Sequence, residues 1–202
     1  AEIQLAGLKN NMDYFMEHIS KEIRLKVNRN KVLLLISGGV DSSVVAGILL
    51  KTLAPENVYL MYIDTGLMRK NETAEIEINL RSLGAKNITI VDASTTFLTA
   101  LEGVSDPEEK REIIGDLFIK IQEKELPEEL SDMYFLSQGT LYTDLIESGK
   151  GVGDNAKLIK SHHNVRSPLV EKKRNAGLII EPLDKLFKDE VRRLGITLGI
   201  DQ

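Results

Sequence analysis

The sequence predicts an α/β fold, a doubly wound, mostly parallel sheet with helices on both faces. Short apolar runs alternate along the chain with segments whose apolar residues recur at helical spacing. The first run, residues 31–36, is apolar enough for a strand that is covered on both faces. It leads into the glycine turn Gly38-Gly39 and then into the apolar stripe of a helix. Strands and helices that alternate in this way favour parallel pairing through crossover connections.

The other elements follow from the same periodicities, in chain order. Residues 1–30 are expected to contain a leading helix, because apolar residues from Leu8 to Ile23 fall on one helical face. Residues 31–202 are expected to form one domain. Its further strands are predicted at residues 58–63, 88–91, 133–136, 158–159 and 178–180. Its helices are predicted at residues 44–53, 71–84, 106–121 and 184–194.

Local signals set several of these boundaries. Asn71 and Asp106 are of the types that cap helix N-termini, and Pro107 suits a first helical position. The last helix is expected to stop at Gly195. In a doubly wound sheet, ligands gather at the carboxyl ends of the strands. That rule places the Ser37 loop, Asp64 and the segment after Leu136 on one rim.

Composition narrows the class of protein. With 202 residues and 42% hydrophobic content, the chain can bury one substantial core. A net charge of −5, with Lys and Arg spread along the chain, does not suggest an extended nucleic-acid surface. The sequence shows neither a long apolar span nor a signal-peptide pattern, so no membrane partner and a cytoplasmic location are expected. The absence of cysteine excludes disulfides and thiolate metal sites.

The turn after the first strand has the composition of a phosphate-binding loop. Glycines let the backbone approach a ligand closely, and the amides that open the next helix attract anions. The string is neither a Walker loop nor a dinucleotide fingerprint. A Gly-x-Gly-x-x-Ala string does occur at residues 151–156, but a polar segment and not a strand precedes it. The alternative is a plain strand-to-helix turn in which Asp41 and Ser42 merely cap the helix.

The loop resembles the pyrophosphate loop of the N-type ATP pyrophosphatases, whose fold is that of the adenine nucleotide α hydrolases. The resemblance rests on seven consecutive residues, Ser37, Gly38, Gly39, Val40, Asp41, Ser42 and Ser43. It implies that these residues bind ATP and hold the leaving pyrophosphate. It also implies that Asp41 lies at a Mg²⁺ ion, because a bare carboxylate would repel the phosphates.

Later strings are similar to ordered landmarks of the GMP synthetases within this family. They are found at residues 62–69, 106–115, 138–148, 159–165 and 181–192. The resemblance implies amination of xanthosine 5′-monophosphate (XMP) to GMP. ATP would adenylate the purine C2 oxygen to give adenyl-XMP, and ammonia would then displace AMP. A phosphate ester leaves more readily than a purine carbonyl oxygen, and cations and amides would stabilise the charge that develops.

The same resemblance implies roles for residues outside the loop. Asp144, Glu147, Lys160 and His162 fall in segments that cover the reacting nucleotides and are expected to be catalytic, together with Asp41. Asp64, Gln138, Gly139 and Thr140 are expected to contact ATP, and Arg111 the XMP phosphate. For Asp144 and Glu147, three residues apart, the alternative is a solvated helix end. His162 and His163 are adjacent, so they do not suggest a chelating pair, and ordinary loop structure is the rival interpretation for both.

The resemblance also implies partners. Glutaminases of the usual kinds need a nucleophilic cysteine, which this chain lacks, so a separate glutamine amidotransferase subunit is expected to supply ammonia. The family's full-length form is expected to be a homodimer through a carboxy-terminal region that helps to bind XMP. That region is expected to be largely absent, because the sequence stops at Gln202.

Two departures from the family pattern stand out. Thr143 replaces a usual proline, and residues 166–169 read Arg-Ser-Pro-Leu where Gly-Gly-Leu-Pro is usual. The stretch from there to Glu181 is also longer than expected. Either a lid of altered shape or missing residues would explain it. Two other functions stay open, another N-type ATP pyrophosphatase such as an NAD synthetase, and a non-catalytic nucleotide-binding or regulatory subunit.

Overall fold

The computed structural model describes residues 12–67, 69, 71–130, 133–139 and 168–200. Its centre is a five-stranded sheet in the order β3-β2-β1-β4-β5. The strands are β1 (Lys31–Ile36), β2 (Val58–Asp64), β3 (Asn87–Asp92), β4 (Tyr134–Ser137) and β5 (Ile179–Ile180). Every pairing is parallel, with Val32 beside Val58 on one side of β1 and beside Phe135 on the other. The predicted doubly wound parallel sheet is confirmed.

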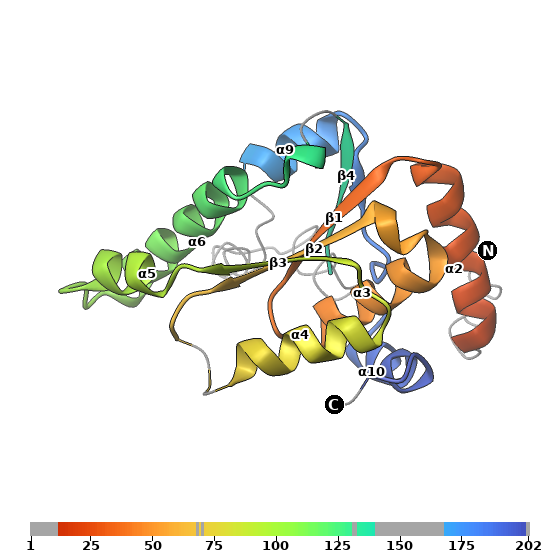
Figure 1. Ribbon diagram of the computed structural model, residues 1–202, viewed down its shortest axis with the longest axis horizontal. Coiled ribbons are helices and arrows are strands. Elements are labelled where there is room, and N and C mark those ends of the chain that lie inside the picture. Colours follow the sequence, from red (N-terminus) through yellow and green to blue (C-terminus); the bar gives the residue numbers. More distant parts are fainter. Residues whose placement is uncertain (1–11, 68, 70, 131–132, 140–167, 201–202) are drawn as a thin grey trace, which may run out of the picture.

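Helices cover both faces of this sheet (Figure 1). On one face lie α2 (Met12–Val27), α3 (Val40–Thr52), α4 (Glu72–Ser82) and α10 (Lys188–Thr197). On the other lie α5 (Ser94–Leu101), α6 (Pro107–Lys124) and α9 (Pro168–Asn175). Two short 3₁₀ turns are η1 (Pro55–Asn57) and η2 (Glu128–Leu130). The sequence did not predict α5 or α9, and the strand expected at residues 158–159 lies outside the described residues.

Alternate residues of the strands feed two apolar clusters, as the period-2 geometry of a strand requires. Leu60 and Tyr62 of β2 belong to the larger cluster, with α2, α3, α4 and α10. Tyr59 and Met61 belong to the smaller cluster, with α5, α6 and α9. Lys173 of α9 is buried among apolar groups there, where its ammonium donates to the Tyr134 carbonyl over 2.7 Å. The two-sided burial that the apolar strands predict is therefore present.

The predicted helix starts at Asp106 and Asn71 are both confirmed, but only Asp106 makes the expected capping bond. The Asp106 carboxylate accepts a hydrogen bond from the Glu109 amide over 3.0 Å, which is the expected N-cap. Asn71 occupies the N-cap position of α4, but its side chain makes no capping bond and its backbone is left-handed, at φ +69°. The Glu72 carboxylate instead turns back to accept the Arg69 amide over 2.9 Å.

The last helix also differs from its predicted span. It begins at Lys188, because the Phe187 amide donates to Glu190 in the first turn. Gly195 does not stop it and lies buried inside the helix, where a Cβ would lie 3.3 Å from Val44 of α3. Gly195 thus permits close packing of two helices, and Gly199, at φ +76°, follows the true end.

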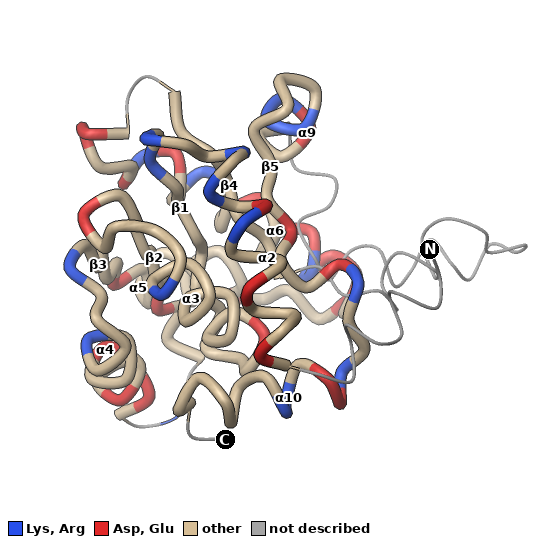
Figure 2. The backbone as a smooth tube through the Cα atoms, turned by 90° about the vertical axis from the view of Figure 1, so that its right-hand side faces the viewer, with Lys and Arg blue, Asp and Glu red and all other residues tan. Residues whose placement is uncertain are grey.

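Charge is mixed over the described backbone, with Lys and Arg positions interspersed among Asp and Glu positions (Figure 2). None of the helices in the described ranges combines the length and the apolar character needed to cross a membrane.

Candidate active site at the carboxyl ends of the strands

The loop between β1 and α3 lies at the centre of the sheet, where β1 separates β2 from β4. Gly38 adopts φ +83°, a left-handed conformation that favours glycine. Gly39 is the N-cap of α3 and has no side chain, so the first amides of α3 lack a hydrogen bond from the N-cap residue. Asp41 is therefore not the cap, and that part of the alternative interpretation is wrong. Uncapped amides at a helix N-terminus suit an anion.

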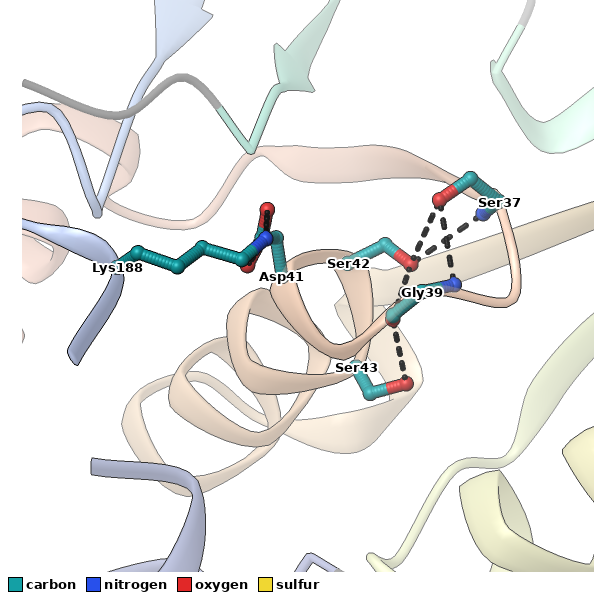
Figure 3. A network of polar contacts seen from close by, with 6 residues as sticks. All are labelled: Ser37, Gly39, Asp41, Ser42, Ser43 and Lys188. Carbon is teal, nitrogen blue, oxygen red and sulfur yellow. Dashed lines mark hydrogen bonds and ion pairs between the residues drawn. The ribbon is translucent and has the colours of Figure 1, made fainter. Parts of the chain in front are cut away.

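Three serine hydroxyls tie this loop together (Figure 3). The Ser42 hydroxyl accepts from the Ser37 amide over 3.3 Å and donates to the Gly39 carbonyl over 3.1 Å. The Ser43 hydroxyl donates to the same carbonyl over 3.2 Å, and the Ser37 and Ser42 hydroxyls are 3.2 Å apart. The hydroxyls thus fix the turn while Ser37 and Gly39 stay exposed. The turn is thus fixed by its own hydrogen bonds, next to the uncapped first amides of α3.

A wall of side chains from β2 and α4 supports the loop from behind. A Cβ placed on Gly38 would lie 3.3 Å from Glu72 Oε1 and 3.3 Å from Ile76 Cδ1, with the Tyr62 ring behind them. The Tyr62 hydroxyl is buried and has no hydrogen-bond partner among the described residues. Burial raises the pKa of Tyr62; the carboxylates of Glu72 and Asp64 add to this, and the Thr73 hydroxyl opposes it. A side chain at Gly38 would therefore require Glu72 and Ile76 to shift by a few tenths of an ångström.

Asp41 is paired with a lysine from a distant part of the chain. Its carboxylate accepts from the Lys188 ammonium with both oxygens, at 3.1 and 2.8 Å. Lys188 is the first residue of α10 and reaches across to the first turn of α3 (Figure 3). The Lys188 side chain is 51% exposed and that of Asp41 27%. The pair therefore places a cation at the first turn of α3, which follows the phosphate-loop glycines.

Sequence reasoning named the string around Lys188 but gave this residue no role. One signal was available. A cation in the first turn of a helix opposes the helix dipole, which favours acidic residues there. Asp189 and Glu190 follow that preference, and Lys188 breaks it. A residue that breaks a local rule points to a role elsewhere, here at Asp41.

The end of β4 closes the site on the other side of β1. A Cβ on Gly139 would lie 3.7 Å from the Cβ of Asp41, so the predicted neighbours Gly139 and Asp41 do come together. The Ser137 hydroxyl and the Gln138 side-chain oxygen are buried and without hydrogen-bond partners among the described residues. Buried polar atoms are normally satisfied, so these two are available to a ligand or to water.

Asp64 lies at the same rim, but both of its carboxylate oxygens already accept hydrogen bonds from nearby residues. Its Oδ1 accepts the Gly66 amide over 2.9 Å and its Oδ2 accepts the Thr73 hydroxyl over 2.8 Å. The carboxylate thus joins the end of β2 to the first turn of α4. A direct contact from Asp64 to ATP stays a prediction.

Arg111 is exposed on α6 and pairs with Glu108 on the same helix, at 2.9 Å. Its predicted contact with the XMP phosphate stays a prediction. Five other expected site residues lie outside the described residues, namely Thr140, Asp144, Glu147, Lys160 and His162.

The comparison with protein families decides the broad assignment. The model of a family described as NAD synthase matches residues 11–114, just over half of the chain. The chain belongs to the NAD synthase family. The matched part contains α2, the phosphate loop and strands β1 to β3.

Curated proteins that are similar to this chain have a more specific name than the family. The chain is 46% identical over 199 residues to a protein of Campylobacter fetus named GMP synthase [glutamine-hydrolyzing], covering 95% of this chain and 36% of that protein. It is 49% identical over 199 residues to a protein of the same name from Limosilactobacillus reuteri, covering 97% and 37%. The chain spans about a third of the length of these relatives. The resemblance to the GMP synthetases is confirmed.

Solved structures support the fold of the NAD synthase family member. The NH3-dependent NAD synthetase of Campylobacter jejuni, solved with a nitrate ion, matches 94% of this chain and 74% of its own with a TM-score of 0.66 at 15% identity. The U34-tRNA thiolase NcsA of Methanococcus maripaludis matches 94% and 66% with a TM-score of 0.57 at 20% identity. The expected adenine nucleotide α hydrolase-like fold is thereby confirmed.

The residues of the loop between β1 and α3 fit a Mg²⁺ ion that binds together with a polyphosphate. Mg²⁺ takes oxygen ligands and is usually bound through one or two carboxylates plus substrate phosphates. Asp41 supplies one carboxylate at the mouth of the loop, and the Ser42 and Ser43 hydroxyls lie on the same turn. Within the described ranges, no three acidic or histidine side chains gather as a metal cage.

Proposed function

We propose that this chain is the ATP-pyrophosphatase part of a GMP synthase. It would aminate XMP to GMP through adenyl-XMP, with ATP cleaved to AMP and pyrophosphate. The observation that carries this proposal is the loop from Ser37 to Ser43, with uncapped helix amides, tied hydroxyls and the Lys188–Asp41 pair on its rim. Identity of 46% and 49% to proteins named GMP synthase supports the choice of XMP as substrate.

The loop geometry suits a leaving pyrophosphate. Negative charge builds on the β and γ phosphates as the bond to the α phosphate breaks, and donors already in place stabilise it without reorganising. The first amides of α3 are such donors, and the exposed Ser37 hydroxyl lies on the same turn. The Lys188 ammonium adds a full positive charge within reach of the same rim. Mg²⁺ held by Asp41 would neutralise further charge on the phosphates.

The remaining residue roles are part of the proposal. Asp144, Glu147, Lys160 and His162 would act on the reacting nucleotides, and Arg111 would bind the XMP phosphate. Thr140, Gln138 and Gly139 would contact ATP. The Gln138 side-chain oxygen, which has no partner among the described residues, supports its role, because a ligand hydroxyl or amine would satisfy it.

Ammonia is proposed to come from a glutamine amidotransferase subunit. The 202 residues contain no cysteine, so a glutaminase nucleophile of the usual kind lies outside them. Relatives whose names include glutamine hydrolysis are nearly three times as long as the matched region. The homodimer and the cytoplasmic location stay predictions. Sedimentation tests the first, and cell fractionation tests the second.

The first test is a reaction with defined products. The purified chain is incubated with Mg·ATP and ammonium, with and without XMP, and AMP, ADP, pyrophosphate and GMP are quantified. Equal amounts of GMP, AMP and pyrophosphate, formed only with XMP, would support the proposal. ADP as the main product would contradict cleavage at the α–β bond.

Two controls sharpen this test. Asp41→Asn should remove most of the activity, while Asp189→Asn, an exposed acidic residue on α10, should leave it within about twofold. Equal losses in both variants would show that Asp41 acts only as one of many surface charges.

A second candidate is an NAD synthetase, favoured by the description of the matching family. An arm with the deamido form of NAD in place of XMP distinguishes it. AMP formed in that arm alone would replace the GMP synthase assignment. A non-catalytic nucleotide-binding subunit would bind Mg·ATP and form no AMP in either arm.

A further inference from the structure

The Lys188–Asp41 pair occupies the position where the metal is expected. Both Asp41 oxygens accept from a single ammonium, at 3.1 and 2.8 Å. A Mg²⁺ ion on the same carboxylate would therefore face a full positive charge at close range. Two cations on one partly buried carboxylate repel each other, and burial reduces the screening by water. A bare metal ion therefore competes with Lys188 for Asp41.

The pair is not needed to stabilise the Asp41 charge. Asp41 lies in the first turn of α3, where the helix dipole already favours a carboxylate. Lys188 lies in the first turn of α10, where the dipole disfavours a cation. Half-exposed ion pairs contribute little to stability. The unfavourable interaction with a helix dipole thus falls on Lys188 and not on Asp41. This suggests that the Lys188 ammonium has a second partner.

Lys188 can leave Asp41 without a change of fold. Its backbone is held by α10, whose first turn is fixed by the bond from the Phe187 amide to Glu190, at 3.1 Å. The helix itself packs on α3 at Gly195, close to Val44. The side chain has four rotatable carbon–carbon bonds and is 51% exposed, so it alone can swing toward a new anion.

We propose that Lys188 is an exchangeable counter-ion that excludes free divalent metal from Asp41 and releases it to a metal–polyphosphate complex. A polyphosphate brings negative charge for the Lys188 ammonium at the same moment as its metal ion takes over Asp41. A free metal ion brings no such partner and must leave Lys188 unpaired. The loop thus distinguishes Mg·ATP from Mg²⁺. This inference rests on the proposed function only in that the ligand is a metal–nucleotide complex.

The test measures metal binding directly. Free Mn²⁺ is followed by electron paramagnetic resonance during titration of the full chain, of Lys188→Met and of Lys185→Met. Lys185 is the matched control, because its side chain is 48% exposed and its ammonium lies 3.9 Å from the carboxylate of Glu22. Lys188→Met should bind Mn²⁺ at least tenfold more tightly than the unchanged chain. Lys185→Met should match the unchanged chain.

The same titration is repeated with an ATP analogue that carries a methylene group between the α and β phosphates and so is not cleaved there. The order should now reverse, and Lys188→Met should bind the Mn²⁺ complex more weakly than the unchanged chain does. Asp41→Asn should weaken Mn²⁺ binding in the Lys188→Met background, which locates the metal. Circular dichroism and thermal unfolding confirm that each variant is folded.

Two results would overturn the inference. One is that Lys188→Met binds free Mn²⁺ no more tightly than Lys185→Met. The other is that tighter binding persists after Asp41→Asn, which would place the metal elsewhere. No XMP or ammonia is used, so tighter Mn²⁺ binding together with absent GMP formation would contradict the proposed reaction and leave the exchange supported.

Discussion

The two faces of the sheet differ in how completely they are covered. On one face, α3 has nine buried residues among its 13, and Val44 through Leu50 are buried without a break. On the other, α6 is longer, at 18 residues, but only Gln122 is buried. Its apolar residues, such as Leu117 and Phe118, are only partly buried against the smaller cluster. The predicted apolar stripe of α6 is present but half covered.

This difference separates a firmly packed helix, α3, which we call the platform, from a loosely packed helix, α6, which we call the arm. The phosphate loop is mounted on α3, so its geometry inherits the rigidity of the larger core. Arg111, expected to contact the second substrate, is mounted on α6, whose packing is looser. A deeply packed helix holds a site within a narrow geometry, and a partly packed one gives less restraint. The following predictions test this contrast.

The largest effect is expected from truncating the α3 core. Leu49→Ala should lower the free energy of unfolding by about 2–5 kcal/mol, because Leu49 is fully buried and leaves a cavity. Leu117→Ala on α6 should cost about 1–2 kcal/mol, because only part of its side chain leaves water on folding. Urea unfolding measures both. Equal costs would remove the distinction between platform and arm.

The next effect concerns the loop itself. Gly38→Ala should cost about 1–3 kcal/mol of stability, because Gly38 is at φ +83° and a Cβ would press on Glu72 and Ile76 at 3.3 Å. It should also weaken binding of Mg·ATP, since relief of the clash moves the loop. Isothermal titration calorimetry measures the binding.

Gly103→Ala is the control for Gly38→Ala. Gly103 has a similar φ, +76°, but nothing lies within 4 Å of a Cβ there. It should cost about 1–2 kcal/mol from the backbone alone and leave nucleotide binding unchanged. Weaker nucleotide binding in both variants would show that the effect is not local to the loop.

A smaller effect is expected at the start of α6. Asp106→Ala should cost about 1 kcal/mol, because the Glu109 amide loses the acceptor that now lies at 3.0 Å. Thermal unfolding, followed by circular dichroism, measures the loss. Asp116→Ala, at an exposed position inside the same helix, serves as the control and should change stability by less than about 0.5 kcal/mol.

The smallest effect is a pH dependence on the well-covered face. Burial raises the pKa of Asp184, with Lys185 opposing the shift and Glu181 and Glu22 adding to it. The native state thus holds this proton more tightly than the unfolded chain, where Asp titrates near about 3.9. Stability contributed by the protonated form is lost as the pH rises through the native pKa.

Asp184→Asn removes that loss. The variant should gain stability relative to the unchanged chain as the pH rises from about 4 to 7, as measured by urea unfolding at each pH. A difference between the two proteins that stays constant over this range would mean that Asp184 titrates alike in both states.

Much of the fold could be predicted from the sequence because its signals are local. Apolar runs give the strands, and the Asp106 cap needs only its own helix. Gly39, Asp41 and Gly139 could be placed on one rim because parallel strands end together. What could not be predicted depends on contacts between distant segments. The Lys188–Asp41 pair joins residues 147 positions apart, and no periodicity encodes it.

The wrong helix end at Gly195 and the missing capping bond at Asn71 have the same origin. Gly195 is typical of a helix end, yet here it lets α10 approach α3 at Val44, a tertiary reason for a glycine. At Asn71 a left-handed backbone and the Glu72 side chain replace the expected cap. Tertiary packing overrides local preference at both positions.

The strand order also has a consequence for how the chain folds. Strands β1, β2 and β3 are joined by short crossovers, whereas β1 pairs with β4 only through partners about a hundred residues apart, such as Lys31 and Tyr134. Closing so long a loop is entropically costly and slows the step that depends on it. The approach of Gly139 to Asp41, at the carboxyl ends of β4 and β1, is thus expected to form late. During folding, the loop between β1 and α3 would therefore form before β4 completes the site around it.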